Sequence, residues 1–542
     1  MTTLFRFHSV ILGLLKFVPS TNLFYLLIVF VLVSGCTVSL KPLTDLELEK
    51  ITEIDQALMF PEKQRVFGEI SFQEALARAL KYNLDKRAKV MEQALALKQV
   101  DLDGYQLLPT LIAKGGYSDR SEFSASNSKE RGDGPGPTSG YSYSGDRTIF
   151  KGDLTLSWNV LDFGLSYFNA RQNADRALIV DERRRKVIHN LIREVQFSYW
   201  RMVAAQKLGA RVKVAVKRAE KALFDAETVE KEKLQTPTEI LQYQKRLLQN
   251  IRKLETVNQQ LSTAQVELAA LINIPPGTNF RVVVPKTDVL KIPRWSVPVE
   301  KMELLAFHKN PDIREKIYQD RITVGEVKKS LIQLLPGIDL SGGRNSDSNS
   351  FQDVNRWFAW SSTLSINVLK LFSAPAQVLH NKAKKALAEA QRLAIRMAVI
   401  AQVHVAKKQY ENAVNQYERA DKMYRIDKRL SDQISKRQES DIGSMLERIS
   451  QETAAIDAEL RRFETYSNMM SAVAQIHSTL GVSIIDDKMS TNDLPKLSQF
   501  VQKGLNDWLS GYAISTEVRQ FEKFKAQKKL RMADIQKSSG FK

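Results

Sequence analysis

Two short stretches of the chain alternate between apolar and polar residues. In residues 150–160, one face would carry Phe150, Gly152, Leu154, Leu156, Trp158 and Val160. In residues 358–368, the corresponding face would carry Phe358, Trp360, Ser362, Leu364, Ile366 and Val368. A period of two predicts β-strands with one apolar and one polar face. Their length of about 11 residues suits a tilted transmembrane strand, although a strand of a soluble sandwich alternates in the same way.

A much longer helical pattern follows each strand. Residues 166–235 and 376–480 contain no proline and only one glycine each, Gly209 and Gly443. We expect a long helix and a returning helix in each half, with reversals at 233–238 and 437–443; a helix of some 60 residues would be roughly 90 Å long. Apolar residues spaced by seven predict coiled-coil packing, at Ile240, Leu247, Leu254, Leu261 and Leu268 in the first half and at Ile442, Ile449, Ile456, Phe463 and Met470 in the second.

These elements occur twice because the chain contains an internal duplication. The segment Gln106-Leu107-Leu108-Pro109 returns as Gln333-Leu334-Leu335-Pro336, and a Gly-Gly pair follows each copy. Each proline should end a helix, and a partner strand should begin after it, at 111–118 and 338–344. Each half therefore predicts one β-hairpin, which gives four strands per chain. The hairpin tips would be the exposed loops 121–147 and 345–356.

The duplication also divides the chain into segments. We expect a first repeat at 71–274, a linker at 275–298 and a second repeat at 299–481. Residues 36–70 show little periodicity and are predicted to be a tether. Residues 482–542 form a basic C-terminal extension, and from residue 511 onward its composition is that of a flexible tail.

The N-terminal residues predict a lipoprotein signal peptide at 1–35. Basic residues precede an apolar run from Leu23 to Val33, which is short for a spanning helix but suits a signal peptide. The run ends in Val33-Ser34-Gly35-Cys36, which resembles a bacterial lipobox, so Cys36 is the predicted lipidation site. Several acyl chains on Cys36, palmitate among them, would anchor the protein firmly. Thr37 in place of aspartate resembles lipoproteins sent to the outer membrane; the alternative is a buried thiol after a plain signal anchor.

Composition and charge narrow the possible functions. The chain is 43% hydrophobic and 26% charged, with a mean hydropathy of -0.29, which is too much charge for a bundle of membrane-spanning helices. The net charge of +19 is compatible with nucleic acid, an anionic membrane surface or anionic cargo. Because Lys and Arg are spread along the helices, without zinc-ligand spacing or an aromatic nucleic-acid motif, we expect solvated helix faces and no nucleic acid. Anionic cargo remains a hypothesis.

The sequence gives no indication of catalysis. The six histidines are scattered, and His404 and His477 lie within the long helical stretches. There is no glycine-rich phosphate loop, no HExxH motif and no nucleophile elbow. We therefore expect no enzyme, no cofactor and no metal site.

Four amphipathic strands cannot close a barrel, and an open edge in lipid would leave backbone groups unpaired. At least two chains must therefore pool their strands, since the smallest known barrels use eight. At residues 70–481 the chain resembles the TolC-like outer-membrane efflux proteins. The resemblance rests on the helix openings before Asn83 and Asn310, the Leu-Pro strand starts, the Asn-Val-Leu strand ends and the helix lengths, all occurring twice in the same order.

This resemblance implies a mainly α-helical protein with a transmembrane β-barrel. A homotrimer would close a twelve-stranded barrel in the outer membrane of a Gram-negative bacterium, continued by an α-helical barrel in the periplasm. Such proteins are passive exit ducts of tripartite efflux or type I secretion systems. Their partners are a periplasmic adaptor (membrane fusion) protein, an inner-membrane transporter and outer-membrane lipid.

The resemblance also suggests residues at the periplasmic entrance of the duct. Many family members have a glycine at each helix reversal, an aspartate six residues later and another carboxylate three residues beyond. Here Lys233 and Gln438 replace the glycines, Glu239 and Ser444 align with the aspartates, and Glu447 aligns with the later carboxylate. Rings of Glu239 and Glu447 could select ions. Alternatively, both are exposed glutamates stabilised by the dipole of a helix N-terminus.

A second hypothesis belongs to another class of protein. The chain could be a lipid-anchored periplasmic coiled-coil scaffold or adaptor, in which the alternating segments form a small soluble β-domain. Its long heptad stretches are compatible with both hypotheses.

Overall fold

The computed structural model describes residues 41–60, 68–126, 142–232, 236–285, 290–293, 297–440, 444–485 and 493–538. Cys36 and the predicted signal peptide lie outside these ranges. The chain divides into two compact units, residues 1–62 and 63–542. In its described ranges no helix is both long and apolar enough to cross a membrane.

The first unit contains helix α3 (Asp45–Met59). Thr44 and Glu47 form a capping box: the Thr44 N–H donates to Glu47 Oε2 at 2.9 Å, and the Glu47 N–H donates to Thr44 Oγ1 at 3.4 Å. The predicted tether therefore contains a helix. Sequence analysis missed it because the apolar residues of this short segment do not follow one clear period.

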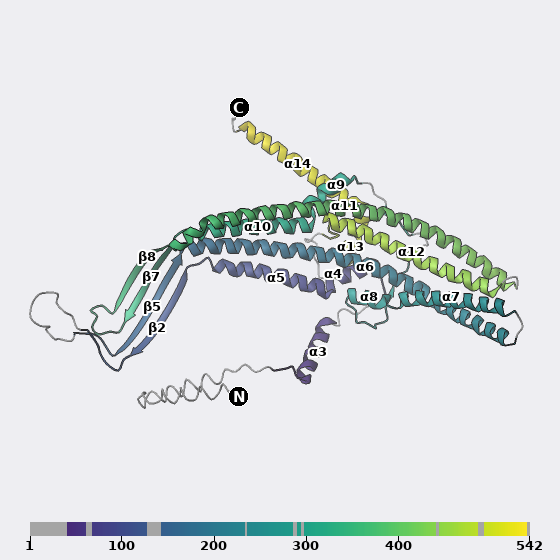
Figure 1. Ribbon diagram of the computed structural model, residues 1–542, viewed down its shortest axis with the longest axis horizontal. Helices are drawn as coiled ribbons and strands as arrows, with labels where there is room; N and C mark the ends of the chain where they lie inside the picture. The colour runs from purple at the N-terminus through teal and green to yellow at the C-terminus, as the bar shows by residue number, and fades with distance from the viewer. Residues whose placement is uncertain are drawn as a thin grey trace, which may run out of the picture. The chain divides into compact units, whose positions relative to one another are not determined.

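The main sheet of the second unit has four antiparallel strands, as the sequence predicted (Figure 1). Strands from the two repeats pair directly, since Leu156 lies opposite Gly342 in the register. The order in the sheet is β2 (Thr110–Asp119), β5 (Thr148–Asn159), β7 (Gly337–Asp347) and β8 (Arg356–Ser365).

Four further strands are very short. β3 (Ser124–Ser126) and β4 (Ser142–Gly145) pair within the first predicted hairpin tip. β1 (Glu69–Ile70) pairs in parallel with β6 (Arg281–Val282), so the predicted linker 275–298 contains a strand that joins it to the start of the first repeat. Two-residue strands have no detectable period, which is why the sequence did not reveal them.

The long helices begin where strands β5 and β8 end. α6 (Val160–Lys231) and α11 (Val368–Glu439) each contain 72 residues, which corresponds to roughly 110 Å. Both are longer than predicted because they start directly after their N-caps, Asn159 and Asn367, whose side chains accept backbone N–H groups three residues on. Pro375 lies within the start of α11.

The return helices confirm both predicted reversals. α6 ends at Lys231 and α7 (Pro237–Ser262) follows, continued by α8 (Ala264–Leu271); α11 ends at Glu439 and α12 (Met445–Leu480) follows. The heptad positions in the described ranges are buried: Ile240, Leu247, Leu254, Leu261 and Leu268, and Ile449, Ile456, Phe463 and Met470. The sheet and the reversals lie at opposite ends of the second unit (Figure 1).

The helices form a layer whose order follows from their contacts. Near the sheet, α5 (Leu84–Tyr105) packs on α6, α6 on α10 (Pro311–Ile332), and α10 on α11. Nearer the reversals, α7 packs on α6, α6 on α12, and α12 on α11. α6 and α11 thus run through both halves of the layer, and the shorter helices fill the space beside them.

Shorter helices lie about midway along this layer. They are α4 (Phe72–Tyr82), α9 (Val299–Lys309), α13 (Leu494–Leu509) and α14 (Tyr512–Ser538). In α13, the Trp508 indole is 1% exposed and stacks on His477 of α12 with ring centroids 4.3 Å apart. At the start of α14, Ile514 and Val518 are buried in a cluster with Met302 of α9.

The expectation of a flexible tail from residue 511 onward is wrong for the start of α14, where Ile514 and Val518 are buried. The preceding helix, α13, was not predicted. Leu497, Val501, Leu505 and Trp508 are all buried and recur at helical spacing. This spacing is present in the sequence, but residues 482–542 were interpreted only by their positive charge.

We predict that Gly481→Ala destabilises the protein. Gly481 ends α12 at φ 72°, and a Cβ there would lie 2.0 Å from the Lys309 carbonyl oxygen. The left-handed backbone and this clash should together lower the free energy of unfolding by about 2–4 kcal/mol. Gly209→Ala is the matched control, because nothing lies within 4 Å of a Cβ at this helical position; it should stabilise by about 0.5–1 kcal/mol. Equal apparent Tm values for wild type and Gly481→Ala would contradict the prediction.

We predict that His477 makes stability fall in acid. Burial lowers the pKa of His477 to about 4, whereas an unfolded histidine titrates near 6.5. Between these pH values the histidine binds a proton in the unfolded chain but stays neutral in the folded chain. The free energy of unfolding should therefore decrease by on the order of 3 kcal/mol as pH falls from about 6.5 to 4. His477→Phe keeps the ring stack and should flatten this decrease in denaturant titrations, whereas His380→Phe, at an exposed position, should not.

Candidate functional site

The four-stranded sheet has one apolar and one polar face, as predicted. Neighbouring strands place Leu111, Leu156 and Gly342 in one row and Ala113, Leu154 and Arg344 in the next. Large apolar side chains on this face are exposed: Phe150, Leu154, Leu156, Phe358, Trp360 and Leu364. Exposed apolar residues over most of a sheet face fit contact with lipid.

The opposite face of the sheet carries charged and polar pairs between strands. Lys151 Nζ lies 3.3 Å from Asp347 Oδ2, and the Asn159 amide donates to Asp339 Oδ1 at 2.6 Å. Lys114 and Asp153 form a looser pair at 4.0 Å. Such cross-strand pairs stabilise a face in contact with water.

Both glycines of the second Gly-Gly pair lie close to neighbouring strands: a Cβ at Gly343 would lie 2.7 Å from the Leu154 carbonyl oxygen. A Cβ at Gly342 would lie 2.4 Å from the Trp360 ring, so the indole lies across the bare backbone of β7. The matching Gly115 and Gly116 have nothing within 4 Å, and the structure gives no reason for them.

In the described part of the chain, the sheet has two edge strands without a second partner, and the outermost helices of the layer have no neighbour on their outer side. Among the described strands, β2 and β8 each pair on one side only. The outermost helices, α5 and α11, expose many apolar side chains: Met91, Leu95, Leu102 and Tyr105 on α5, and Leu369, Phe372, Leu379, Leu387 and Met397 on α11. One copy of the chain therefore leaves backbone groups and apolar surface open along both edges.

Buried carboxylates join the two repeats. Glu459 of α12 is fully buried and lies between Lys207 and Arg211 of α6, with Lys207 Nζ 3.0 Å from Oε1. Glu182 of α6 pairs with Arg314, in the first turn of α10, at 2.8 Å. Burial raises the pKa of Glu182, against the opposing effect of Arg185 and Arg314. Removing one partner of such a pair is usually strongly destabilising, so these pairs hold the repeats in a fixed arrangement.

The structure brings the predicted entrance residues to the same end of the molecule. Glu239 lies in the first turn of α7, Ser444 is the N-cap of α12, and Glu447 lies in its first turn. Ile240 and Ile449, next to them in sequence, share one buried cluster, so the two tips pack together.

The two glutamates differ in their surroundings. Glu239 accepts a hydrogen bond from Thr236 Oγ1 at 2.6 Å, which fits a role in starting the helix. Glu447 is exposed and makes no hydrogen bond or ion pair with any described residue, so its charge is open to solvent. The Ser444 side chain makes no cap hydrogen bond.

Arg448 is a tip residue that sequence analysis missed. Its Nη1 donates to the side-chain oxygen of Gln438, across the second reversal. A guanidinium beside Glu447 weakens the net negative charge of this tip. The signal was present in the sequence as a basic residue next to the aligned carboxylate.

Within the described residues, no group of three or more His, Cys, Asp or Glu side chains could hold a metal ion.

The two faces of the sheet, its open edges and the long helical hairpins fit one subunit of a membrane channel. Residues 75–273 match the family model described as outer membrane efflux protein. This match covers most of the first predicted repeat, and it agrees with the family that the sequence resembles. Among curated proteins, no match to this chain is found.

Solved structures of such channels share this fold. The outer-membrane channel OprN is similar with a TM-score of 0.57 and 16% identity, over 76% of this chain and 89% of OprN. The CmeC channel of Campylobacter jejuni gives a TM-score of 0.59 and 14% identity, over 76% of this chain and 85% of CmeC. The open state of the MtrE channel of Neisseria gonorrhoeae gives 0.59 and 17%, over 76% and 88%. The predicted mainly helical fold, with four strands joined to long helical hairpins, is thus confirmed.

We predict that an arginine introduced at the centre of β5 is tolerated on one sheet face only. Leu156→Arg places a guanidinium on the apolar face and should reduce the amount of protein in the outer-membrane fraction, because a lipid-facing Arg costs about 1–4 kcal/mol depending on depth. Ser157→Arg, one residue further on β5, points to the polar face and should leave that amount unchanged. Equal behaviour of the two variants would contradict the assignment of the faces.

Proposed function

We propose that this protein is an outer-membrane exit duct. It would carry cargo passively out of the cell as part of a tripartite efflux or type I secretion system. The observation that carries the proposal is the sheet: it has one exposed apolar face and two unpaired edges, and the long helices continue directly from its strands.

A homotrimer is the proposed assembly. In lipid, the free backbone groups of β2 and β8 must find partners, and pairing β8 of one copy with β2 of the next satisfies them. Two copies would give eight strands and three would give twelve; the family resemblance favours three. The same closure would bring α5 of one copy against α11 of the next and cover their exposed apolar side chains.

The remaining parts of the proposal concern anchoring and partners. Cys36 is the proposed lipid anchor in the outer membrane. The helix tips around Glu239, Ser444 and Glu447 are the proposed periplasmic entrance, where an adaptor protein and an inner-membrane transporter would dock. The net charge of +19 favours anionic over cationic cargo.

Fractionation of cells separates the duct from a lipid-anchored periplasmic scaffold. The duct hypothesis expects trimers in the outer-membrane fraction that migrate differently before and after heating. Soluble monomers after removal of the lipid anchor, for instance with Cys36→Ala and a cleavable signal peptide, would instead favour the scaffold.

We predict that Glu447→Ala raises single-channel conductance in planar bilayers. A ring of exposed carboxylates at the proposed entrance would hold cations and slow their passage, and alanine removes that ring. Glu255→Ala, at an exposed α7 position away from the tip, is the control and should leave conductance unchanged. If conductance and ion selectivity of Glu447→Ala equal those of wild type, Glu447 does not form such a ring.

A further inference from the structure

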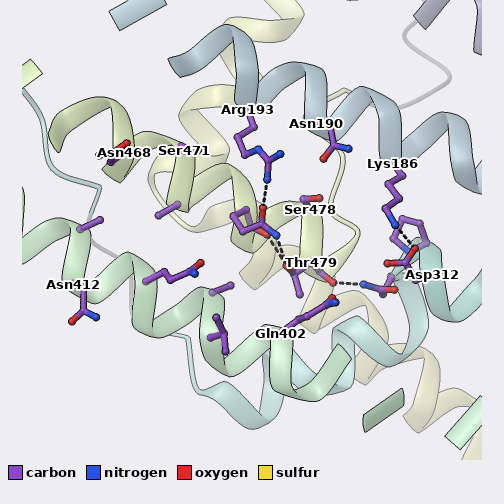
Figure 2. A pocket seen from close by; sticks show the side chains of 18 of the residues that line it. Lys186, Asn190, Arg193, Asp312, Gln402, Asn412, Asn468, Ser471, Ser478 and Thr479 are labelled. Atoms are coloured by element: carbon purple, nitrogen blue, oxygen red, sulfur yellow. Dashed lines mark hydrogen bonds and ion pairs between the residues drawn. The ribbon is translucent and has the colours of Figure 1, made fainter. Parts of the chain in front are cut away.

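A polar cavity lies where α10 and α12 meet between the two long helices (Figure 2). Its volume is about 760 Å³, within the range of ligand pockets. Side chains from α6, α10, α11 and α12 line it. No aromatic side chain does, and its apolar members are small or few: Pro311, Val405, Ala406, Ala413 and Ala472.

Side-chain amides dominate the lining of this cavity. They are Asn190, Asn310, Gln402, Gln409, Asn412, Gln416, Asn468 and Gln475. Asn310 is used in the fold, since it donates to the Thr479 carbonyl at 2.8 Å and accepts from the Ile313 N–H at 3.1 Å. In contrast, Asn412 and Asn468 make no hydrogen bond with any described residue, and so they are available to a ligand.

Two cationic side chains of α6 border the cavity, and only one of them has an acidic partner among the described residues. Lys186 Nζ pairs with Asp312 Oδ1 at 2.8 Å, which neutralises it. Arg193 Nη1 donates to the neutral Gln475 amide at 2.8 Å, so its positive charge has no counterion within the cavity. Figure 2 shows Arg193 pointing from α6 toward α12, over the cavity.

The cavity lies on the face of the helix layer away from α13. On α12, Ser471 and Ser478 line it, whereas His477 is turned to the other side and stacks on Trp508 of α13.

The α13 side is continuous with the lipid-facing side of the sheet. Trp158 on the apolar face of β5 contacts Phe163 of α6, with ring centroids 5.6 Å apart. Tyr167 lies one turn after Phe163. Tyr167, Leu178 and His189 are 11 residues apart, which is about three helical turns, so they lie on one face of α6. His189 in turn stacks toward Trp508, at 6.3 Å. In a closed ring, α13 is therefore outside and the cavity faces the duct.

We propose that this cavity is a transit site for carbohydrate, with a preference for sugars that carry a carboxylate. Hydroxyl groups both donate and accept hydrogen bonds, as side-chain amides do, so a lining of amides suits a polyhydroxylated solute. The absence of aromatic and large aliphatic side chains among the lining residues disfavours apolar drugs. Arg193 supplies the one uncompensated charge and matches a carboxylate. The inference rests on the proposed duct function.

Single-channel recording of the full-length protein in planar bilayers tests this proposal. The probes are maltotetraose and tetragalacturonate, which are neutral and acidic oligosaccharides of equal length. Both should block the current transiently, and tetragalacturonate should do so at a concentration at least about fivefold lower, since a charge-assisted hydrogen bond is stronger than a neutral one.

Variants separate the two parts of the site. Asn412→Ala combined with Asn468→Ala should raise the half-blocking concentration of both probes about tenfold. Arg193→Gln should abolish only the preference for tetragalacturonate. Asn415→Ala and Arg419→Gln, at exposed α11 positions outside the cavity, are matched controls and should change neither value.

Three results would count against the account, and they are distinguishable. A protein that forms no conducting pore contradicts the proposed duct function itself. Conducting pores that neither probe blocks, or that the amide variants leave unchanged, contradict the carbohydrate site. A preference for tetragalacturonate that Arg419→Gln reduces as much as Arg193→Gln would assign the preference to the overall charge of the duct.

Discussion

The need to pair every backbone group in lipid governs this molecule. A hydrocarbon interior offers no water to an open sheet edge, so a sheet with one lipid-facing side must be closed. One copy of the chain provides four strands and leaves β2 and β8 each with a free edge. The duplication doubles the number of strands per chain without removing the edges. The proposed assembly of several copies would pair these edges. It would also cover the exposed apolar residues of α5 and α11.

The junction between strand and helix transmits this constraint to the rest of the protein. Asn159 and Asn367 cap the long helices directly at the ends of β5 and β8, so the direction of each strand sets the start of each helix. Ion pairs such as Glu182 with Arg314, and Glu459 with Lys207, then hold the first repeat against the second. The sheet, the helix layer and the helix tips are thus continuous with one another. The amide-lined cavity lies within the helix layer.

Sequence reasoning predicted the elements that have a strong period. The alternation in 150–160 and 358–368 gave the two clearest strands, and the heptads around Leu247 and Ile456 gave the returning helices. The duplication supplied what each segment alone lacked, because a weak signal that occurs twice in the same order is much more specific than one that occurs once.

Other features depend on contacts between distant segments. Trp508 stacks on His477 and lies near His189, which is far from it in sequence, so only the folded chain shows what α13 packs against. The pairing of β1 with β6 has the same character. At the tips, the sequence identified the positions of Glu239 and Glu447. Only the structure shows that Glu239 accepts a hydrogen bond from Thr236, which distinguishes it from Glu447. The cavity combines residues of four helices, and no single stretch of sequence indicates it.

Neighbouring copies close the sheet in the proposed assembly. Cysteine pairs scanned along β2 and β8 on the same face, such as Ala113→Cys with Ser362→Cys, test it by disulfide cross-linking in the native membrane. Pairing of β8 with β2 of the next copy predicts cross-linked species of two and three chains and none larger, because a ring of three has no free edge left. Cross-links confined to single chains, or a ladder that continues beyond three, would contradict it.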